Sequence, residues 1–203
     1  VSDLKREFGE RVIGVQMDVT DAVSVAQGYG EIIRTWGGFD LVVINAGIAL
    51  VSSLATMELE RFRKLEEVNV EGTMLVLSQA ARFFERQAMG GDIVLVSTKN
   101  VISPGAQFGA YSATKAAAHQ LGRVASLELA PIGVRVNMVA PDAVFGEKER
   151  KSGLWAEVGP GRMKARGLDE DGLEEYYRDR NLLKAKITAR HVANAVLYFA
   201  THQ

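Results

Sequence analysis

Short apolar runs that alternate with longer helical segments constrain the fold of this chain more than any other feature. The runs are Val12–Met17, Asp40–Ile44, Ile93–Val96 and Val134–Val139. Continuous apolar runs rich in Val and Ile are typical of strands that are buried on both faces. Such strands, joined by helices of about a dozen residues or more, form a parallel sheet with helices on both faces. The alternation therefore predicts an α/β fold with a doubly wound parallel sheet.

The segments between the runs carry helix signals of their own. Ser2–Gly9 has the composition of the end of a helix. Thr20 and Asp21 provide an N-cap for a helix that runs through Trp36 and ends at two glycines. Further helices are predicted over Glu58–Met89, over Ser112–Ala130 and from Thr188 to Ala200.

Polar and small residues follow each predicted strand directly. These residues are Asp18, Asn45-Ala46-Gly47, Ser97-Thr98 and Pro141-Asp142-Ala143-Val144. In open α/β sheets, ligands bind in the crevice beyond the carboxyl ends of the strands. We therefore expect a binding site where these four segments meet.

Tyr111 and Lys115 lie four residues apart at the start of a predicted helix. At that spacing the two side chains share one helix face, with Cβ atoms about 5–6 Å apart. A tyrosine has a pKa of ~10 in water, so it can act as a proton carrier near neutral pH only if that pKa is lowered. A cation about 4 Å away stabilises the phenolate by on the order of 4 kcal/mol, which is enough to lower the pKa that far. Tyr111 is therefore a candidate acid/base. The alternative is that the two side chains lie on an exposed helix face in contact with solvent and have no catalytic role.

Five short motifs in order resemble the short-chain dehydrogenase/reductase family. They are Asp18-Val19, Asn45-Ala46-Gly47, Val68-Asn69-Val70, Tyr111-Ser112-Ala113-Thr114-Lys115 and the strand from Asn137 to Pro141. Each motif alone is weak, but together on the expected elements they are specific. The resemblance spans Asp18 to about Phe199. It implies a Rossmann-like fold and NAD(P)-dependent hydride transfer with a small alcohol, aldehyde or ketone as substrate.

The resemblance also implies catalytic roles. Tyr111 would move the alcohol proton, and Lys115 would lower the tyrosine pKa and bind the nicotinamide ribose. Thr98, thirteen residues before Tyr111, would hold the reacting oxygen, with Ser97 as the second choice on the opposite face of the strand. Asn69 would hold a water that passes the proton outward; the alternative is that it satisfies helix backbone.

The implied cofactor is NAD or NADP, with NAD slightly favoured. The implied cofactor-binding residues are Asp18, Val19, Asn45, Ala46, Gly47, Tyr111, Lys115, Pro141 and Val144. No metal site is expected, because the three histidines are scattered singly without metal-ligand spacing. The alternative function is a non-catalytic relative that keeps the fold for dinucleotide binding or assembly.

Two departures from the family pattern lead to further expectations. No glycine-rich turn of the kind that approaches a pyrophosphate follows an opening strand, so we expect a fragment that lacks the first strand-helix-strand unit and the last strand. Lys99-Asn100 and Asp142 stand where small residues are commoner. With Ser152–Trp155 and Tyr176–Arg178, they resemble the dehydrogenase half of bifunctional rhamnulose-1-phosphate aldolase/alcohol dehydrogenase proteins, which handle lactaldehyde-type products.

Lys99 has three possible roles at its position beside the crevice. It is expected to cap a strand end or to pair with Asp142, and the alternative is contact with an anionic substrate.

The composition excludes several classes of protein. A formal net charge of -1 argues against a surface built for nucleic acid or an anionic membrane. The absence of cysteine excludes thiol catalysis, thiolate metal sites and disulfides. The longest apolar run, Leu41–Val51, is well short of the roughly 20 residues of a membrane span. Together with the lack of a leader at the start of the chain, these features predict a cytoplasmic protein.

We expect one domain over residues 1–203. Its weakly periodic segment at about 145–186 would be a lid or substrate-binding insertion, or a mobile solvated loop. The helical segments Val68–Arg86 and Ser112–Ala130 carry many small or apolar residues, which favours a homo-oligomer. The alternative is a well-buried helix pair within a monomer.

Overall fold

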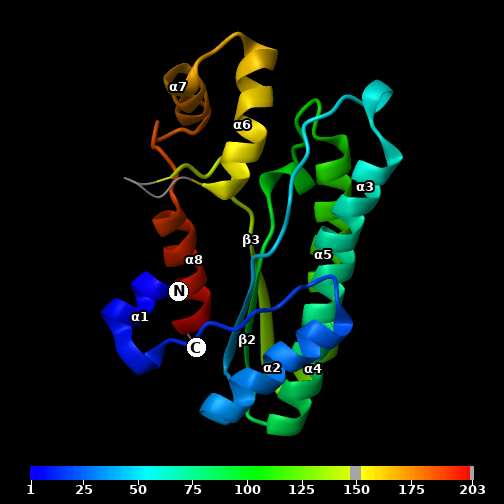
Figure 1. Ribbon diagram of the computed structural model, residues 1–203, viewed down its shortest axis with the longest axis vertical. Helices are drawn as coiled ribbons and strands as arrows, with labels where there is room; N and C mark the ends of the chain where they lie inside the picture. The colour runs from blue at the N-terminus through cyan, green and yellow to red at the C-terminus, as the bar shows by residue number, and fades with distance from the viewer. Residues whose placement is uncertain (147–151, 202–203) are drawn as a thin grey trace.

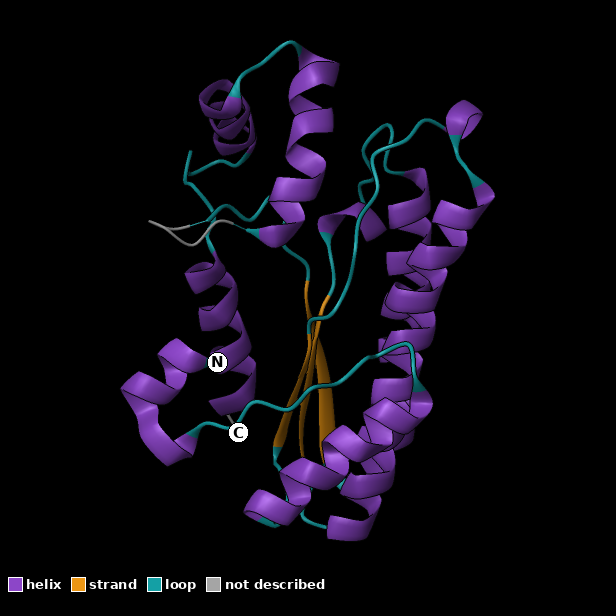
Figure 2. Ribbon diagram, in the orientation of Figure 1, coloured by secondary structure: helices purple, strands orange, loops and turns teal. Residues whose placement is uncertain are grey.

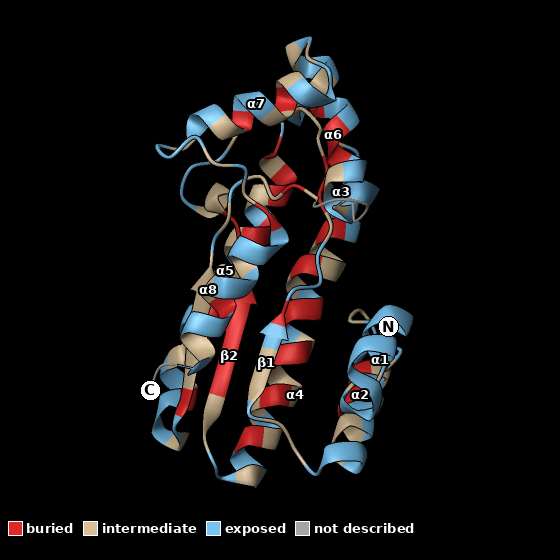
Figure 3. Cartoon of the chain, turned by 90° about the vertical axis from the view of Figure 1, so that its left-hand side faces the viewer, coloured by how far each residue is buried: buried red, intermediate tan, exposed pale blue. Residues whose placement is uncertain are grey.

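A parallel sheet forms the centre of the computed structural model, which describes residues 1–146 and 152–201. Its strands are β1 (Leu41–Ile44), β2 (Gly91–Val96) and β3 (Val134–Val139), in the order β1-β2-β3. The central strand β2 is the most deeply buried of the three, since Ile93, Val94 and Leu95 are at most 1% exposed (Figure 3). The predicted parallel α/β sheet is confirmed.

Helices cover both faces of the sheet, as Figure 2 shows. On one face lie α4 (Gly72–Gln87) and α5 (Gly109–Leu129), with α2 (Ala22–Trp36) packed against α4. On the other face lies α8 (Ala189–Thr201), which contacts β2 and β3. The remaining helical elements around the core are α1 (Ser2–Phe8), η1 (Gly9–Arg11), η2 (Leu54–Thr56), η4 (Lys99–Val101) and η5 (Ala130–Ile132). The doubly wound arrangement is therefore present.

Helix α5 lies close against the sheet because of a glycine in its middle. A Cβ at Gly122 would lie 3.2 Å from both Leu95 on β2 and Met138 on β3. A larger side chain there would push the helix outward, since such contacts are tighter than ordinary packing. The close approach holds the first turn of α5, which carries Tyr111, beside the end of β2.

The helix predicted over Glu58–Met89 forms with a π-helical turn inside it. That turn, η3 (Glu67–Glu71), separates α3 (Leu59–Glu66) from α4. The hydroxyl of Thr73 donates a hydrogen bond of 2.7 Å to the carbonyl oxygen of Asn69 in this turn. Single π turns within helices occur frequently at functional sites, because the extra residue re-aims a side chain.

The strand predicted over Val12–Met17 is absent, so that prediction is wrong. Val12 has extended backbone, with φ -130° and ψ 125°, but the segment pairs with no strand among the described residues. Met17 and Val19 pack against the core instead. An apolar run becomes a strand only through hydrogen bonds to a neighbour, and composition alone does not supply that neighbour.

The segment at about 145–186 contains two helices, α6 (Gly153–Arg166) and α7 (Glu170–Arg180), joined by Gly167 in a left-handed conformation. Figure 1 shows them beyond the carboxyl ends of the strands. Phe145, Leu173 and Tyr177 form a small core of their own there. Residues 147–151 of the predicted insertion lie outside the described residues. Across the described ranges, no helix has both the length and the apolarity that a membrane crossing requires.

Candidate active site

A cavity of about 810 Å³ lies over the carboxyl ends of the strands and extends along β1, and α6, α7 and α8 also contribute to its lining. Many of the residues singled out from the sequence line it. They are Asn45, Gly47, Ser97, Thr98, Tyr111, Lys115, Pro141, Asp142, Ala143 and Val144. Asp18, Val19, Ala46 and Asn69 are not part of the lining. Segments that follow β1, β2 and β3 thus share one crevice, while the segment at Asp18 stands apart from it.

Tyr111 and Thr98 lie side by side on the wall of this cavity, with the Thr98 hydroxyl close enough to influence the phenol by hydrogen bonding. Tyr111 is 9% exposed, and its ring lies 5.9 Å from that of Phe108. Burial raises the pKa of Tyr111, and the hydrogen bond with Thr98 lowers it in part. The expected lowering of this pKa by Lys115 is not found, because removing the phenolate from water is the dominant effect.

Ser97 and Thr98 face different surroundings, as alternation along a strand requires. The Ser97 hydroxyl lies 2.9 Å from Nδ1 of His119 on α5, whereas Thr98 interacts with Tyr111. Thr98 also accepts a hydrogen bond of 3.3 Å from the backbone N–H of Asn100 and so caps η4, which begins at Lys99. The arrangement favours Thr98 over Ser97 as the hydroxyl next to the phenol.

Lys115 is buried without a charged partner. Its ammonium donates a hydrogen bond of 2.8 Å to the carbonyl oxygen of Val96, and no carboxylate of residues 1–146 and 152–201 lies within ion-pair distance of it. Burial lowers the pKa of Lys115 to about 8. An ammonium has three protons, so two remain for acceptors that enter the cavity.

Asn69 connects the loop after β1 to α5. Its Oδ1 accepts from the backbone N–H of Ile48 at 2.9 Å, and its Nδ2 donates to the Ile48 carbonyl at 2.9 Å and to Thr114 Oγ1 at 3.0 Å. Both amide protons are therefore used within the protein, and the side chain is 1% exposed. In this structure the side chain holds the Asn45-Ala46-Gly47 loop against the helix that carries Tyr111 and Lys115.

The residues present fit the nicotinamide half of a dinucleotide. Gly47 leaves the loop surface open, since a Cβ there would lie 3.2 Å from Asn69 Oδ1 and 3.9 Å from Lys115 Nζ. The cavity volume is within the range of about 300–1,000 Å³ typical of ligand sites. Asp18 fits less directly: its carboxylate accepts hydrogen bonds from the Thr20 N–H and hydroxyl at 2.9 and 2.8 Å and is exposed.

Sequence reasoning expected a lid or substrate-binding segment here but did not single out the basic side chains that α6 and α7 contribute to the cavity wall. Arg162, Tyr177 and Arg180 line the cavity, together with Trp155. Trp155 stacks edge-on with Phe145 and Tyr177, at 4.8 and 5.3 Å. The only available signal was the recurrence of aromatic and basic residues in a segment without clear periodicity. In the described part of the chain, no group of three or more His, Cys, Asp or Glu is placed to hold a metal ion.

Residues 1–155 match the family described as short chain dehydrogenase. The chain is 35% identical over 191 residues to the uncharacterized oxidoreductase YuxG of Bacillus subtilis, covering 94% of this chain and 27% of that protein. It is 32% identical over 141 residues to the sorbitol dehydrogenase of Cereibacter sphaeroides, covering 70% of this chain and 55% of that enzyme. The match to YuxG thus spans about a quarter of that relative's length, and the match to the sorbitol dehydrogenase about half of it.

Among solved structures, ElxO with NADP bound superposes with a TM-score of 0.81 at 25% identity, covering 100% of this chain and 77% of that one. The likeness extends beyond residue 155, where the family match ends, to α6, α7 and α8.

Proposed function

The chain belongs to the short-chain dehydrogenase/reductase family, and we propose on that basis that it is the site-bearing part of an oxidoreductase that uses NAD or NADP to interconvert an alcohol and a carbonyl compound. The observation that carries the proposal is the placement of Tyr111 beside Thr98 on the wall of a cavity that Lys115 and Asn45 also line. A phenol and a hydroxyl in contact form a ready site for one oxygen atom that gains or loses a proton.

The nicotinamide supplies or accepts the hydride. Tyr111 takes the proton of the substrate alcohol, or returns it in the reverse direction, and Thr98 donates a hydrogen bond to the same oxygen. Lys115 would donate its free protons to the ribose of a bound cofactor, and it would stabilise the phenolate that forms when Tyr111 loses its proton. Asn69 holds the Asn45-Ala46-Gly47 loop against α5. We also propose that a water near this residue would pass the proton outward.

The remaining cofactor contacts follow from their positions. Asn45, Gly47, Pro141 and Val144 line the cavity and would contact the nicotinamide half. Asp18, Val19 and Ala46 lie outside it and would contact the adenosine half. NAD is the first cofactor to test, with NADP as the competitor.

Two assays of the full-length protein test the proposal. Fluorescence titration with NADH and NADPH should show saturable binding of at least one of them. A panel of alcohols, polyols, aldehydes and ketones with both cofactors should then show turnover. Absence of binding would contradict the proposal, and binding without turnover of any compound would favour the non-catalytic alternative.

Within the family, we place the chain in the dehydrogenase half of a bifunctional rhamnulose-1-phosphate aldolase/alcohol dehydrogenase. This is supported by the match to YuxG, which covers 94% of this chain but leaves most of that relative's length to other polypeptide. Lactaldehyde and related products of sugar breakdown are the corresponding substrates. The gene region upstream of Val1 tests this assignment, because it should encode a glycine-rich turn and an aldolase.

The protein would act as a cytoplasmic homo-oligomer. Part of the two helical segments that favour association is used within the monomer, since their residues Leu77, Ala80 and Ala125 belong to the main core. The outer face of α5 still exposes Ala117, Val124 and Leu127 at helical spacing, and this face is the proposed contact. Light scattering of the full-length protein should give a mass above that of one chain.

A further inference from the structure

Three basic side chains meet at the cavity, around a single carboxylate. Lys99 follows Thr98 at the end of β2, Arg162 lies on α6 and Arg180 lies on α7, and all three line the cavity. Asp142 is the only acidic residue in the described lining, so three cations less one anion leave two positive charges. Lys115 adds a further ammonium to the same cavity.

Asp142 is shared between two of the cations and satisfies neither at close range. Its carboxylate lies 3.9 Å from Lys99 Nζ and 3.6 Å from Arg180 Nη2. These separations exceed the ~2.7–2.9 Å of a charge-assisted hydrogen bond. Lys99 also has its pKa lowered, first by burial and then by the nearby Arg180 and Arg162, with Asp142 acting in the opposite direction. The cations therefore remain only partly neutralised.

Arg162 is a buried guanidinium without an anionic partner among the described residues. It is 5% exposed, its Nε donates to Tyr177 Oη at 3.3 Å, and its Nη1 donates to the Ala106 carbonyl at 3.3 Å. Its guanidinium lies over the ring of Phe108 at 4.8 Å. Neutral acceptors and a ring face compensate only partly for burying a charge, so a ligand anion would be favourable here.

The cluster lies close to the reacting groups. Lys99 is adjacent in the chain to Thr98, which contacts Tyr111. On the other side, Phe108 separates Arg162 from Tyr111, with its ring 5.9 Å from the Tyr111 ring. An anionic group held by the cluster would thus belong to the same small molecule as the oxygen held by Thr98 and Tyr111.

Building on the proposed oxidoreductase function, but departing from the neutral compound lactaldehyde, we infer that the substrate is an alcohol or carbonyl compound that carries a phosphate or carboxylate group. This group is bound between Lys99, Arg162 and Arg180. Tyr177 contributes a hydroxyl proton to the same anion. Asp142 lowers the net positive charge of the cluster when no ligand is bound, and it competes weakly with the anionic group of the ligand.

Matched substrate pairs test the inference in the full-length protein. Propane-1,2-diol is compared with its 1-phosphate, sorbitol with its 6-phosphate, and propane-1,2-diol with L-lactate for the carboxylate. The ratio of kcat/KM for the anionic member to that for the neutral member should exceed about 10 in at least one pair, as expected for a charge-assisted contact. The pair that shows it identifies the anion as phosphate or carboxylate.

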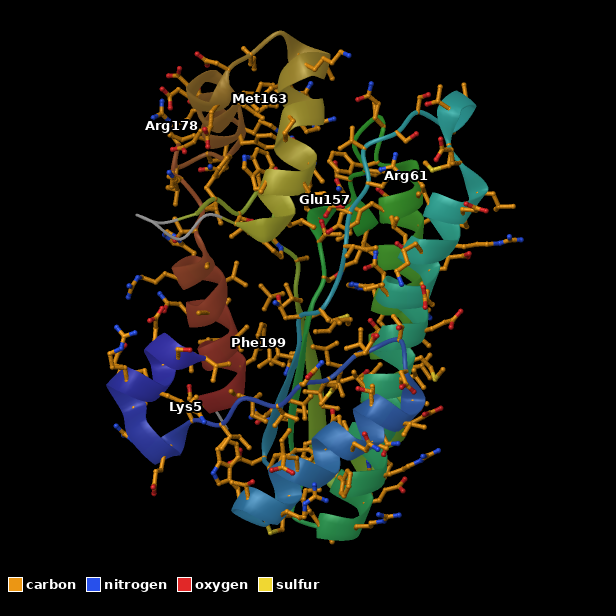
Figure 4. All side chains as sticks on the ribbon, viewed as in Figure 1. Lys5, Arg61, Glu157, Met163, Arg178 and Phe199 are labelled. Carbon is orange, nitrogen blue, oxygen red and sulfur yellow. The ribbon has the colours of Figure 1, made fainter. Side chains whose placement is uncertain are left out.

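Variants locate the preference in the cluster. Lys99→Gln and Arg180→Gln should each lower the ratio about 10-fold, and Arg180→Lys, which keeps the charge, should lower it less. Arg178→Gln is the matched control: Arg178 lies on the same helix, labelled in Figure 4, and pairs with Glu175 at 2.9 Å outside the cavity. Arg178→Gln should leave the ratio unchanged.

A binding measurement gives a readout that does not depend on turnover. In a Trp36→Phe background, Trp155 on the cavity wall is the remaining tryptophan. Titration with inorganic phosphate and with acetate should change its fluorescence in that background. Loss of the change in the Lys99→Gln/Arg180→Gln double variant would support the inference, and its retention would overturn it.

The outcomes separate this inference from the function on which it rests. Tyr111-dependent turnover with equal use of neutral and anionic substrates would overturn the inference alone. No turnover and no cofactor binding would overturn the proposed function. If Arg180→Gln instead weakens NAD or NADP binding without changing the substrate ratio, the cations serve the cofactor's phosphates and the inference is wrong.

Discussion

The two walls of the cavity are built in different ways. The wall formed by the sheet ends and α5 presents two neutral hydroxyls, Tyr111 and Thr98, and one buried ammonium, Lys115, tied to backbone. The wall formed by α6 and α7 presents guanidinium groups over aromatic rings, with Arg162 over Phe108 at 4.8 Å and Arg180 over Tyr177 at 5.3 Å. The match to the family ends at Trp155, in the first turn of α6.

On the proposed function, this difference would separate the chemical step from the selection of the substrate. The sheet wall lies within the part of the chain that matches the family, and its polar groups can move one proton. The helical wall lies almost wholly beyond that match and holds charges that can recognise one part of a substrate. Loops and insertions on a rigid scaffold commonly carry such selectivity.

The largest effect should come from removing the phenol of the sheet wall. Tyr111→Phe should lower kcat at least about 100-fold, because the proton carrier is lost while the cavity shape is kept. Steady-state kinetics with the best substrate of the panel measures this. Tyr29→Phe is the matched control, since that hydroxyl donates to the Val76 carbonyl at 3.2 Å, away from the cavity. Near-normal turnover by the Tyr111→Phe enzyme would contradict the assignment of the chemical step to the sheet wall.

The next effect concerns the neighbouring hydroxyls. Thr98→Val should lower kcat/KM about 10- to 100-fold, because one hydrogen bond to the reacting oxygen is lost at nearly constant volume. Thr98→Ser should retain most activity. Ser97→Ala should change kcat/KM less than about 3-fold, since its hydroxyl bonds His119 instead of Tyr111. The opposite order, with Ser97 the more sensitive, would contradict the assigned orientations of Ser97 and Thr98 after β2.

Replacing Lys115 should lower the activity but raise the stability of the protein. Lys115→Met should abolish most activity yet raise the free energy of unfolding near neutral pH by about 1–2 kcal/mol, because an unpaired buried charge is removed. In the wild type, the folded pKa of about 8 lies below the unfolded value of 10.5, so the unfolded chain binds more protons between these values and stability should rise with pH from about 8.

Urea denaturation across that pH range measures the rise and its loss in Lys115→Met. The pH series should stop near 10.0, the ordinary pKa of tyrosine. Burial raises the pKa of Tyr29 and Tyr111, so above that pH their titration lowers the stability of the folded protein as the pH rises. Lys5→Met, at an exposed position of α1 that Figure 4 labels, should keep the wild-type rise. A rise that survives in Lys115→Met would assign it to another group.

The smallest effect should come from Asp142, the counter-charge of the basic cluster, which lies on the segment after β3. Asp142→Asn should raise the preference for anionic over neutral substrates by about 2- to 5-fold, because partly exposed ion pairs at 3.6–3.9 Å contribute little and their removal leaves the cations free. Competition kinetics on the matched substrate pairs measures the preference. A decrease would mean that Asp142 positions Lys99 and Arg180 more than it competes with the ligand.

The sequence alone determined the parts of this protein that depend on local pattern. Apolar runs predicted β1, β2 and β3, and the Asp21 cap and Gly37 stop predicted α2, because a strand or helix leaves a periodic signature in neighbouring residues. The spacing of Tyr111 and Lys115 predicted one shared face. Counting back from Tyr111 also singled out Thr98, which the structure places in contact with the phenol.

Only the tertiary structure decided which partners those elements meet. It left Val12–Met17 without a strand partner, directed Lys115 to the Val96 carbonyl and raised the pKa of Tyr111 by burial. It also brought Arg162 and Arg180 within the same cavity as Lys99, more than sixty residues away along the chain. Burial, charge balance and strand pairing are sums over residues distant in sequence, so no local pattern carries them.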